Sequence, residues 1–118
     1  GYGVAMGLFD LFRRATSGLP HTVRVDRAFA LLDEGAVLVD VREPAKWRSG
    51  HAPQARHIPL ARLASEGGRL RKDRPVVVVC ASGARSRSGA AQLRSMGYQA
   101  TSLAGGMAAW RSAGGKVR

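Results

Sequence analysis

The sequence contains one cysteine, Cys80, among its 118 residues. A single thiol cannot form an internal disulfide or supply the several ligands of a cysteine-rich zinc or iron–sulfur site, so both are excluded. No apolar run approaches the roughly 20 residues that a membrane-spanning helix requires, and a soluble protein is expected. Because no secretory signal is recognisable and the cysteine is unpaired, a cytoplasmic location is predicted.

Acidic residues are also scarce. Only 8 Asp and Glu stand against 19 Lys and Arg, and the formal net charge is +11. A field of this sign favours anionic partners, whether small anions, nucleic acid or acidic protein surfaces. Aromatic residues make up 6% of the chain, and few of them lie among the arginines, which argues against a platform for single-stranded RNA. The apolar fraction of 45% is typical of a globular chain.

The length of the chain fits one ordinary domain. We interpret residues 1–5 as a remnant of cloning ahead of a natural start at Met6. Residues 6–20 are expected to form a short amphipathic segment and a linker, which either docks on the domain or contacts a partner or a membrane surface. The fold itself is predicted to occupy residues 21–118.

From residue 22 onward, short apolar runs alternate with helical patterns, which is typical of an α/β domain with a largely parallel sheet. Strands are predicted at residues 37–41, 56–58, 76–79 and 100–103. Helices are predicted to start at Asp26 as the N-cap, at Pro44, at residue 60, at Ser86 and after the Gly105-Gly106 turn. The four consecutive valines of the third strand lead directly into Cys80, which therefore lies at the carboxyl end of a central strand.

The segment Cys80-Ala81-Ser82-Gly83-Ala84-Arg85-Ser86 is the most informative part of the sequence. Ligands of a parallel α/β sheet bind at the carboxyl ends of its strands. The N–H groups of a tight loop that leads into a helix can converge on one anion, and the helix dipole favours negative charge there. A thiolate at the start of this loop would be stabilised, which would lower its pKa and make it a nucleophile.

The side chains that follow Cys80 suit this role. Gly83 allows the backbone to curl closely around an anion, and Arg85 offers a planar set of donors for an oxyanion or an anionic sulfur donor. Ser82 and Ser86 can donate hydrogen bonds to the sulfur, or Ser86 can serve as the helix N-cap. A lone cysteine beside a valine run is also commonly a small buried hydrophobe, but a structural cysteine would need neither the glycine nor the arginine.

Four segments, in order, resemble the signatures of the single-domain rhodaneses. They are Val39–Pro44 with Trp47, Gly50–Leu60, Cys80–Ser86 and Leu103–Trp110. The resemblance covers about residues 22–117 and implies a three-layer α/β/α domain with a central, mainly parallel five-stranded sheet. It also implies a sulfurtransferase that moves a sulfane sulfur from thiosulfate or a protein persulfide to cyanide or a thiol, through a persulfide on Cys80.

By the same resemblance, Cys80 is the nucleophile, and the backbone from Ala81 to Arg85, which includes Ser82, Gly83 and Ala84, cradles the anion. Arg85 would position an anionic donor; Ala81 and Ala84 offer no charge. Four residues separate Cys80 from Arg85, whereas phosphatases and arsenate reductases of this fold have five, and the wider ring suits a tetrahedral oxyanion. Three alternatives stay open: a non-catalytic binding or sulfur-relay module that acts only with a protein partner, a phosphatase or arsenate reductase, and a nucleic-acid-binding protein.

Asp40 and Arg42 leave a predicted strand at the same sheet edge as Cys80. A carboxylate at a strand end commonly pairs with an arginine or with loop N–H groups, so we expect these two residues to brace the active loop from behind. His51 and His57 lack a third ligand, and we interpret them as hydrogen-bonded structural residues rather than a metal site. No metal and no cofactor are expected.

The tryptophans Trp47 and Trp110 are predicted to anchor helices over the sheet or to rim the pocket. Basic residues gather before the strand that leads to Cys80, at Arg69, Arg71, Lys72 and Arg74. This cluster is either a solvated loop or a docking surface for an acidic sulfur donor or RNA. Arg87 and Arg94 are expected to extend a positive funnel towards the active site.

Overall fold

The computed structural model describes residues 18–118. The expectations for residues 1–5, and for most of the segment 6–20, therefore lie outside the described residues. Within residues 18–118, no helix is both long enough and apolar enough to cross a membrane.

Five parallel strands form one sheet in the order β1-β5-β4-β2-β3. The strands are β1 (Thr22–Val23), β2 (Val37–Asp40), β3 (Arg56–His57), β4 (Val76–Val79) and β5 (Ala100–Leu103). This arrangement confirms the predicted five-stranded α/β fold. The short β1 is the strand that the sequence pattern does not single out, because two residues show no periodicity.

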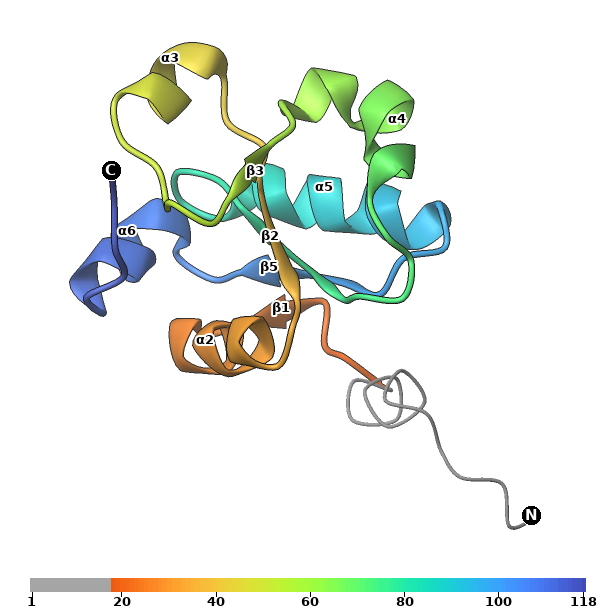
Figure 1. The fold of residues 1–118 in the computed structure, drawn as a ribbon, viewed down its shortest axis with the longest axis horizontal. Coiled ribbons are helices and arrows are strands. Elements are labelled where there is room, and N and C mark those ends of the chain that lie inside the picture. The colour runs from red at the N-terminus through yellow and green to blue at the C-terminus, as the bar shows by residue number, and fades with distance from the viewer. Residues whose placement is uncertain (1–17) are drawn as a thin grey trace, which may run out of the picture.

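Helices cover both faces of the sheet (Figure 1). The α-helices are α2 (Val25–Asp33), α3 (Pro44–Arg48), α4 (Leu63–Glu66), α5 (Ala84–Ser95) and α6 (Gly106–Ser112). Two 3₁₀ turns, η1 (Leu60–Arg62) and η2 (Gly67–Arg69), flank α4, so the single helix predicted from residue 60 is a 3₁₀ turn followed by one α-helical turn.

Two predicted helix starts are wrong. Arg24 is the N-cap of α2, which begins at Val25, so Asp26 lies in the first turn, where its charge favours the helix dipole without capping it. Gly83 is the N-cap of α5, with a φ of +116°, a conformation that glycine adopts readily. The helix therefore begins at Ala84 rather than at Ser86, and the Ser86 hydroxyl is not its cap.

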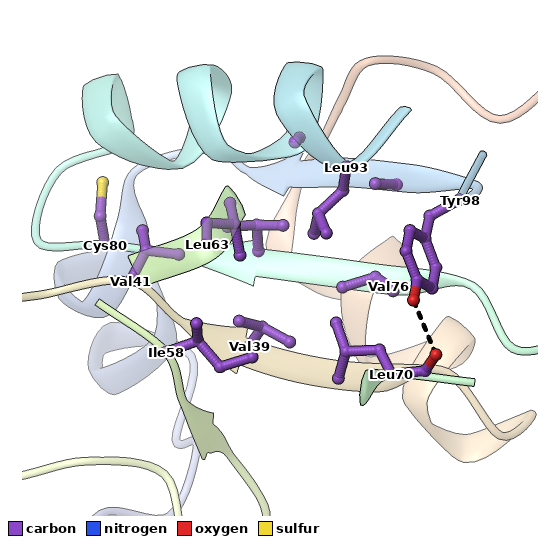
Figure 2. Close-up of a cluster of buried hydrophobic side chains, with 12 residues drawn as sticks. Val39, Val41, Ile58, Leu63, Leu70, Val76, Cys80, Leu93 and Tyr98 are labelled. Carbon is purple, nitrogen blue, oxygen red and sulfur yellow. Dashed lines mark hydrogen bonds between the residues drawn. The ribbon is translucent and has the colours of Figure 1, made fainter. Parts of the chain in front are cut away.

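The core is divided by the sheet into two clusters, because successive side chains of a strand point to opposite faces. Val76, Val78 and Cys80 belong to the cluster that also contains Leu63 of α4 and Leu93 of α5. Figure 2 shows this cluster, with Cys80 at one end and Tyr98 at the other. The cluster on the opposite face of the sheet contains, among its larger side chains, Leu31, Leu38, Val77, Val79, Leu103, Met107 and Trp110.

The register of the sheet brings the functional segments together. Asp40 of β2 pairs with Val79 of β4, and the Val41 N–H donates to the Val79 carbonyl at 3.0 Å. The chain therefore leaves both strands at the same edge, so that Arg42 and Cys80 emerge beside each other. The carboxyl edge of the sheet is the expected position for a ligand site.

Candidate active site

The sulfur of Cys80 lies inside a turn of backbone at the start of α5. Its Sγ accepts hydrogen bonds from the N–H of Gly83 at 3.1 Å and the N–H of Ser86 at 3.3 Å. The Oγ of Ser86 lies 3.4 Å from the sulfur. The predicted backbone cradle, from Ala81 to Arg85, thus extends by one residue, because Ser86 contributes its N–H as well as its hydroxyl.

These contacts change the acidity of the thiol. Burial raises the pKa of Cys80, because it disfavours the charged thiolate. The hydrogen bond with the Ser86 hydroxyl and those from the N–H groups of Ser86, Gly83 and Ser82 lower it, and together they outweigh burial. The net pKa lies below the ordinary value of a thiol, so the thiolate is the favoured form over a wider range of pH.

Ser86 is itself held in place by buried partners. Its hydroxyl lies 3.0 Å from the Gly83 carbonyl and 2.7 Å from the Oγ of Ser102 on β5. Both serines are fully buried. Ser102 was not predicted as a site residue, because an isolated serine in a strand carries no sequence signal of such a role.

Cys80 is 2% exposed, yet it lines a pocket of about 470 Å³. The residues around this pocket come from α3 and its approach, from the loop before α5 and from the first turn of α5: Arg42, Glu43, Ala45, Lys46, Cys80, Ala81, Ser82, Ala84 and Arg85. Ala81 and Ser82 of the loop and Ala84 and Arg85 of the first helical turn are exposed. The sulfur is therefore buried among amide groups but borders a space that can admit a small molecule.

Arg85 stands at the rim of this pocket with 59% of its side chain exposed. Its Nη1 lies 3.7 Å from the Oε1 of Glu43, whose side chain is 63% exposed. The guanidinium is thus directed to a carboxylate across the pocket. Glu43 belongs to the first family-like segment, but no role was predicted for it.

Asp40 and Arg42 form a buried ion pair behind the pocket. Arg42 Nη2 lies 2.6 Å from Asp40 Oδ2, and its Nε lies 2.9 Å from Oδ1. The same Nη2 also donates to the Gly50 carbonyl at 2.8 Å. This pair therefore braces the chain on either side of α3, rather than contacting the loop of Cys80 directly.

The turn Gly105-Gly106 supports the loop from the opposite side. The N–H of Met107 donates to the Cys80 carbonyl at 2.8 Å. Gly106 has a φ of +56°, and a Cβ at this position would overlap the carbonyl oxygen of Cys80. Only glycine permits this close approach. The closing family-like segment contains these residues, but their contact with the active loop is a tertiary feature.

Trp47 of α3 stacks on two imidazole rings, and one of them, that of His57, belongs to strand β3 of the sheet. Its ring is stacked on His51 at 3.6 Å and on His57 at 4.6 Å between centroids. Each histidine also contacts a backbone carbonyl, of Trp47 and Arg42 respectively, at 2.8 Å. Both are thus hydrogen-bonded, as predicted. Trp110, by contrast, packs in the core on α6 as expected.

The basic cluster at residues 69–74 lies at the edge of the sheet opposite to Cys80, because it precedes β4 and Cys80 follows it. Within it, Arg71 is paired with Asp73. Arg94 donates from its Nη1 to the Ala100 carbonyl at 3.0 Å, at the far end of α5. The expectation that Arg94 extends a funnel towards the pocket is therefore wrong.

Comparison with known proteins gives a consistent result. The sequence pattern of the rhodanese-like domain matches residues 25–113. The chain is 40% identical over 88 residues to the thiosulfate sulfurtransferase GlpE of Pseudomonas syringae, covering 74% of this chain and 83% of that protein. It is also 40% identical over 78 residues to a sulfurtransferase of Allochromatium vinosum, covering 65% of this chain and 73% of that protein.

The fold has close counterparts among solved structures. A rhodanese-related protein of Thermoplasma volcanium superposes with a TM-score of 0.76 at 24% identity, covering 84% of this chain and 98% of that one. At this level of identity the likeness concerns the fold alone, and it agrees with the parallel sheet and flanking helices described above.

Proposed function

The chain belongs to the rhodanese-like domain family and is a sulfurtransferase of the rhodanese type, and we propose that it transfers sulfane sulfur through a persulfide on Cys80. The observation that carries this proposal is the position of Sγ, which accepts N–H groups at 3.1 and 3.3 Å beside an open pocket. A lowered thiol pKa provides the nucleophile that such transfer requires.

The first step is attack on the donor. With thiosulfate, the Cys80 thiolate attacks the outer sulfur, the S–S bond breaks, and sulfite leaves with the bonding electron pair. Arg85 and Lys46 at the pocket rim would offer positive charge to the departing sulfite. The product is a persulfide on Cys80, and no proton needs to be taken up.

The second step returns the enzyme to its starting state. Cyanide or a thiolate attacks the outer sulfur, the S–S bond to Cys80 breaks, and the electron pair returns to the cysteine sulfur. The first-turn N–H groups of a helix have no intrahelical acceptor, so those of Ala84 and Arg85 are suited to hold the outer sulfur between the two steps. Such a covalent intermediate predicts ping-pong kinetics.

Intact-protein mass spectrometry tests this proposal. After incubation with thiosulfate the wild-type protein should gain the mass of one sulfur atom, and added cyanide should remove it with release of one equivalent of thiocyanate. Cys80→Ser should show neither the gain nor the turnover. Alkylation of the wild-type thiol provides a second route to the same loss, without a substitution in the buried site. Full turnover by Cys80→Ser would contradict the persulfide mechanism.

The alternatives give different outcomes in the same experiment. A relay module would gain the sulfur but would not release it to cyanide or small thiols without its protein partner. A phosphatase would hydrolyse a phosphate ester, which we do not expect, because four residues rather than five separate Cys80 from Arg85. A protein persulfide as donor and a cytoplasmic location both stay predictions.

A further inference from the structure

Two cations at the pocket rim are available to an anionic sulfur donor. Arg42 also lines the pocket, but its guanidinium is bound to Asp40 and to the Gly50 carbonyl. The remaining cations are Lys46 and Arg85, both exposed. Among the described residues that line the pocket, the one carboxylate is that of Glu43, and it lies 3.7 Å from Arg85.

The position of Glu43 is set by the fold rather than by its own side chain. Glu43 is the N-cap of α3, and its backbone carbonyl accepts hydrogen bonds from the N–H groups of Lys46 and Trp47 at 3.0 and 3.1 Å. The preceding Arg42 is fixed by its buried pair with Asp40. The backbone of Glu43 is therefore fixed at the rim of the pocket, from which its exposed carboxylate reaches Arg85.

From this geometry we infer that Glu43 is a specificity-determining residue that disfavours donors of high negative charge. The inference rests on the proposed function. Glu43 competes with the donor for Arg85, and it also repels any anion that enters the pocket. Both effects grow with the charge of the donor. A dianion such as thiosulfate is thus penalised more than a monoanionic thiosulfonate, in which an organic group replaces one oxygen.

The expected effect is moderate because the pair is exposed and screened by solvent. Replacing Glu43 by glutamine should lower the KM for thiosulfate by about three- to tenfold, and the KM for methanethiosulfonate by less than about twofold. The difference between the variant and the wild type should shrink as salt is added, because exposed charges are screened over about 8 Å at physiological ionic strength.

Steady-state kinetics with both donors test the inference on the wild type, Glu43→Gln and a matched control, Glu66→Gln. Glu66, whose side chain is 32% exposed, also pairs with an arginine, Arg62, at 3.9 Å, and it does not line the catalytic pocket. This control should leave both KM values as in the wild type. Should glutamine impair folding, Glu43→Ser removes the charge and supplies a hydroxyl that is well suited to cap α3.

A binding measurement keeps the inference separate from the persulfide mechanism. In the Cys80→Ser background, calorimetric titration with thiosulfate should give a lower Kd when Glu43 is also replaced, whether or not the wild-type protein turns over. Equal thiosulfate affinity with and without the Glu43 charge would overturn the inference. Equal gains for the dianionic and monoanionic donors would overturn it as well, because charge would then not be the selected property.

Discussion

At the scale of single residues, the reactivity of Cys80 depends on the groups that form hydrogen bonds with its sulfur. The N–H groups of Gly83 and Ser86 and the Ser86 hydroxyl stabilise the thiolate more than burial destabilises it, so the pKa is lowered. A group whose pKa is lower in the folded than in the unfolded state contributes to the free energy of unfolding. This contribution is fully present at pH values above the unfolded-state pKa, and it is lost as the pH falls through the folded-state pKa. Thiolate reactivity should decline only as the pH falls through the lowered pKa of the folded protein and below it.

Replacing Ser86 by alanine should raise the pKa of Cys80, because the hydroxyl contact with the sulfur at 3.4 Å is lost. A hydrogen bond to a charged group contributes about 1.5–3 kcal/mol, so alkylation by iodoacetamide at neutral pH should slow by about tenfold. The rate profile against pH should move to higher pH. Measuring alkylation rates between mildly acidic and alkaline pH checks both expectations.

Ser88→Ala is the matched control, since Ser88 is an exposed serine on the same helix. It should leave the alkylation profile as in the wild type. Ser86→Ala also leaves the buried Ser102 hydroxyl without this partner, which costs about 1–3 kcal/mol of unfolding free energy. An unchanged pH profile in a folded Ser86→Ala protein would mean that the hydroxyl does not act on the thiol.

At the scale of elements, the loop after β4 is held between the N-terminus of α5 and the turn that begins α6. The turn carries two consecutive glycines with positive φ, +76° at Gly105 and +56° at Gly106. Its close packing under the carbonyls of Cys80 and Ala81 explains how a loop that contains two alanines and a glycine keeps one conformation. The geometry of the sulfur site thus depends on residues about 25 positions downstream.

Gly106→Ala should therefore lower both stability and Cys80 reactivity. A residue with a Cβ at this φ costs about 1–2 kcal/mol by itself, and the Cβ would also displace the Cys80 carbonyl. Gly114→Ala separates the two effects, because Gly114 has a φ of +84° with nothing within 4 Å of the added Cβ.

Urea unfolding and alkylation rates should be measured on both variants. We expect Gly114→Ala to lose about 1–2 kcal/mol of unfolding free energy with wild-type alkylation, whereas Gly106→Ala should lose more and also react more slowly. If the two variants lost equal stability and kept equal reactivity, the turn would not support the loop.

At the scale of the whole molecule, the net charge of +11 is not concentrated at the active site. The basic cluster of residues 69–74 and the catalytic pocket lie at opposite edges of the sheet. From Arg74 to Cys80 the chain runs six residues through β4, about 20 Å at 3.3 Å per residue. Salt at physiological strength screens exposed charges over about 8 Å, so the cluster contributes little to the field at the thiol.

Charge removal at the two edges should consequently have different effects. Lys46→Gln, at the pocket rim, should lower kcat/KM for thiosulfate by about three- to tenfold, whereas Arg69→Gln should change it by less than about twofold. Steady-state kinetics at low and physiological salt check this. Equal losses in both variants would indicate that the total charge, rather than its local placement, attracts the donor.

Much of the fold was predictable because its signals are local. The valine run Val76–Val79 predicts a buried strand, and Gly35, with a φ of +109°, lies just past the end of α2, where glycine is favoured. The errors arise where tertiary contacts determine which residue is the helix cap. Asp26 has the usual chemistry of an N-cap, but the chain enters α2 directly from β1, so that Arg24 occupies the N-cap position. The two-residue β1 is stabilised by pairing with β5, which no local pattern encodes.

The sequence by itself determined the chemistry available to this protein: one thiol at the end of a buried strand, followed by a glycine, an arginine and a helix. Local spacing is sufficient for that, since the loop and the helix start are adjacent in the chain. Only the tertiary structure decided the partners of these groups, namely Ser102 behind Ser86, Gly106 beneath the Cys80 carbonyl and Glu43 opposite Arg85. The reason is that each partner lies on a different element, and the parallel sheet brings them together at one edge.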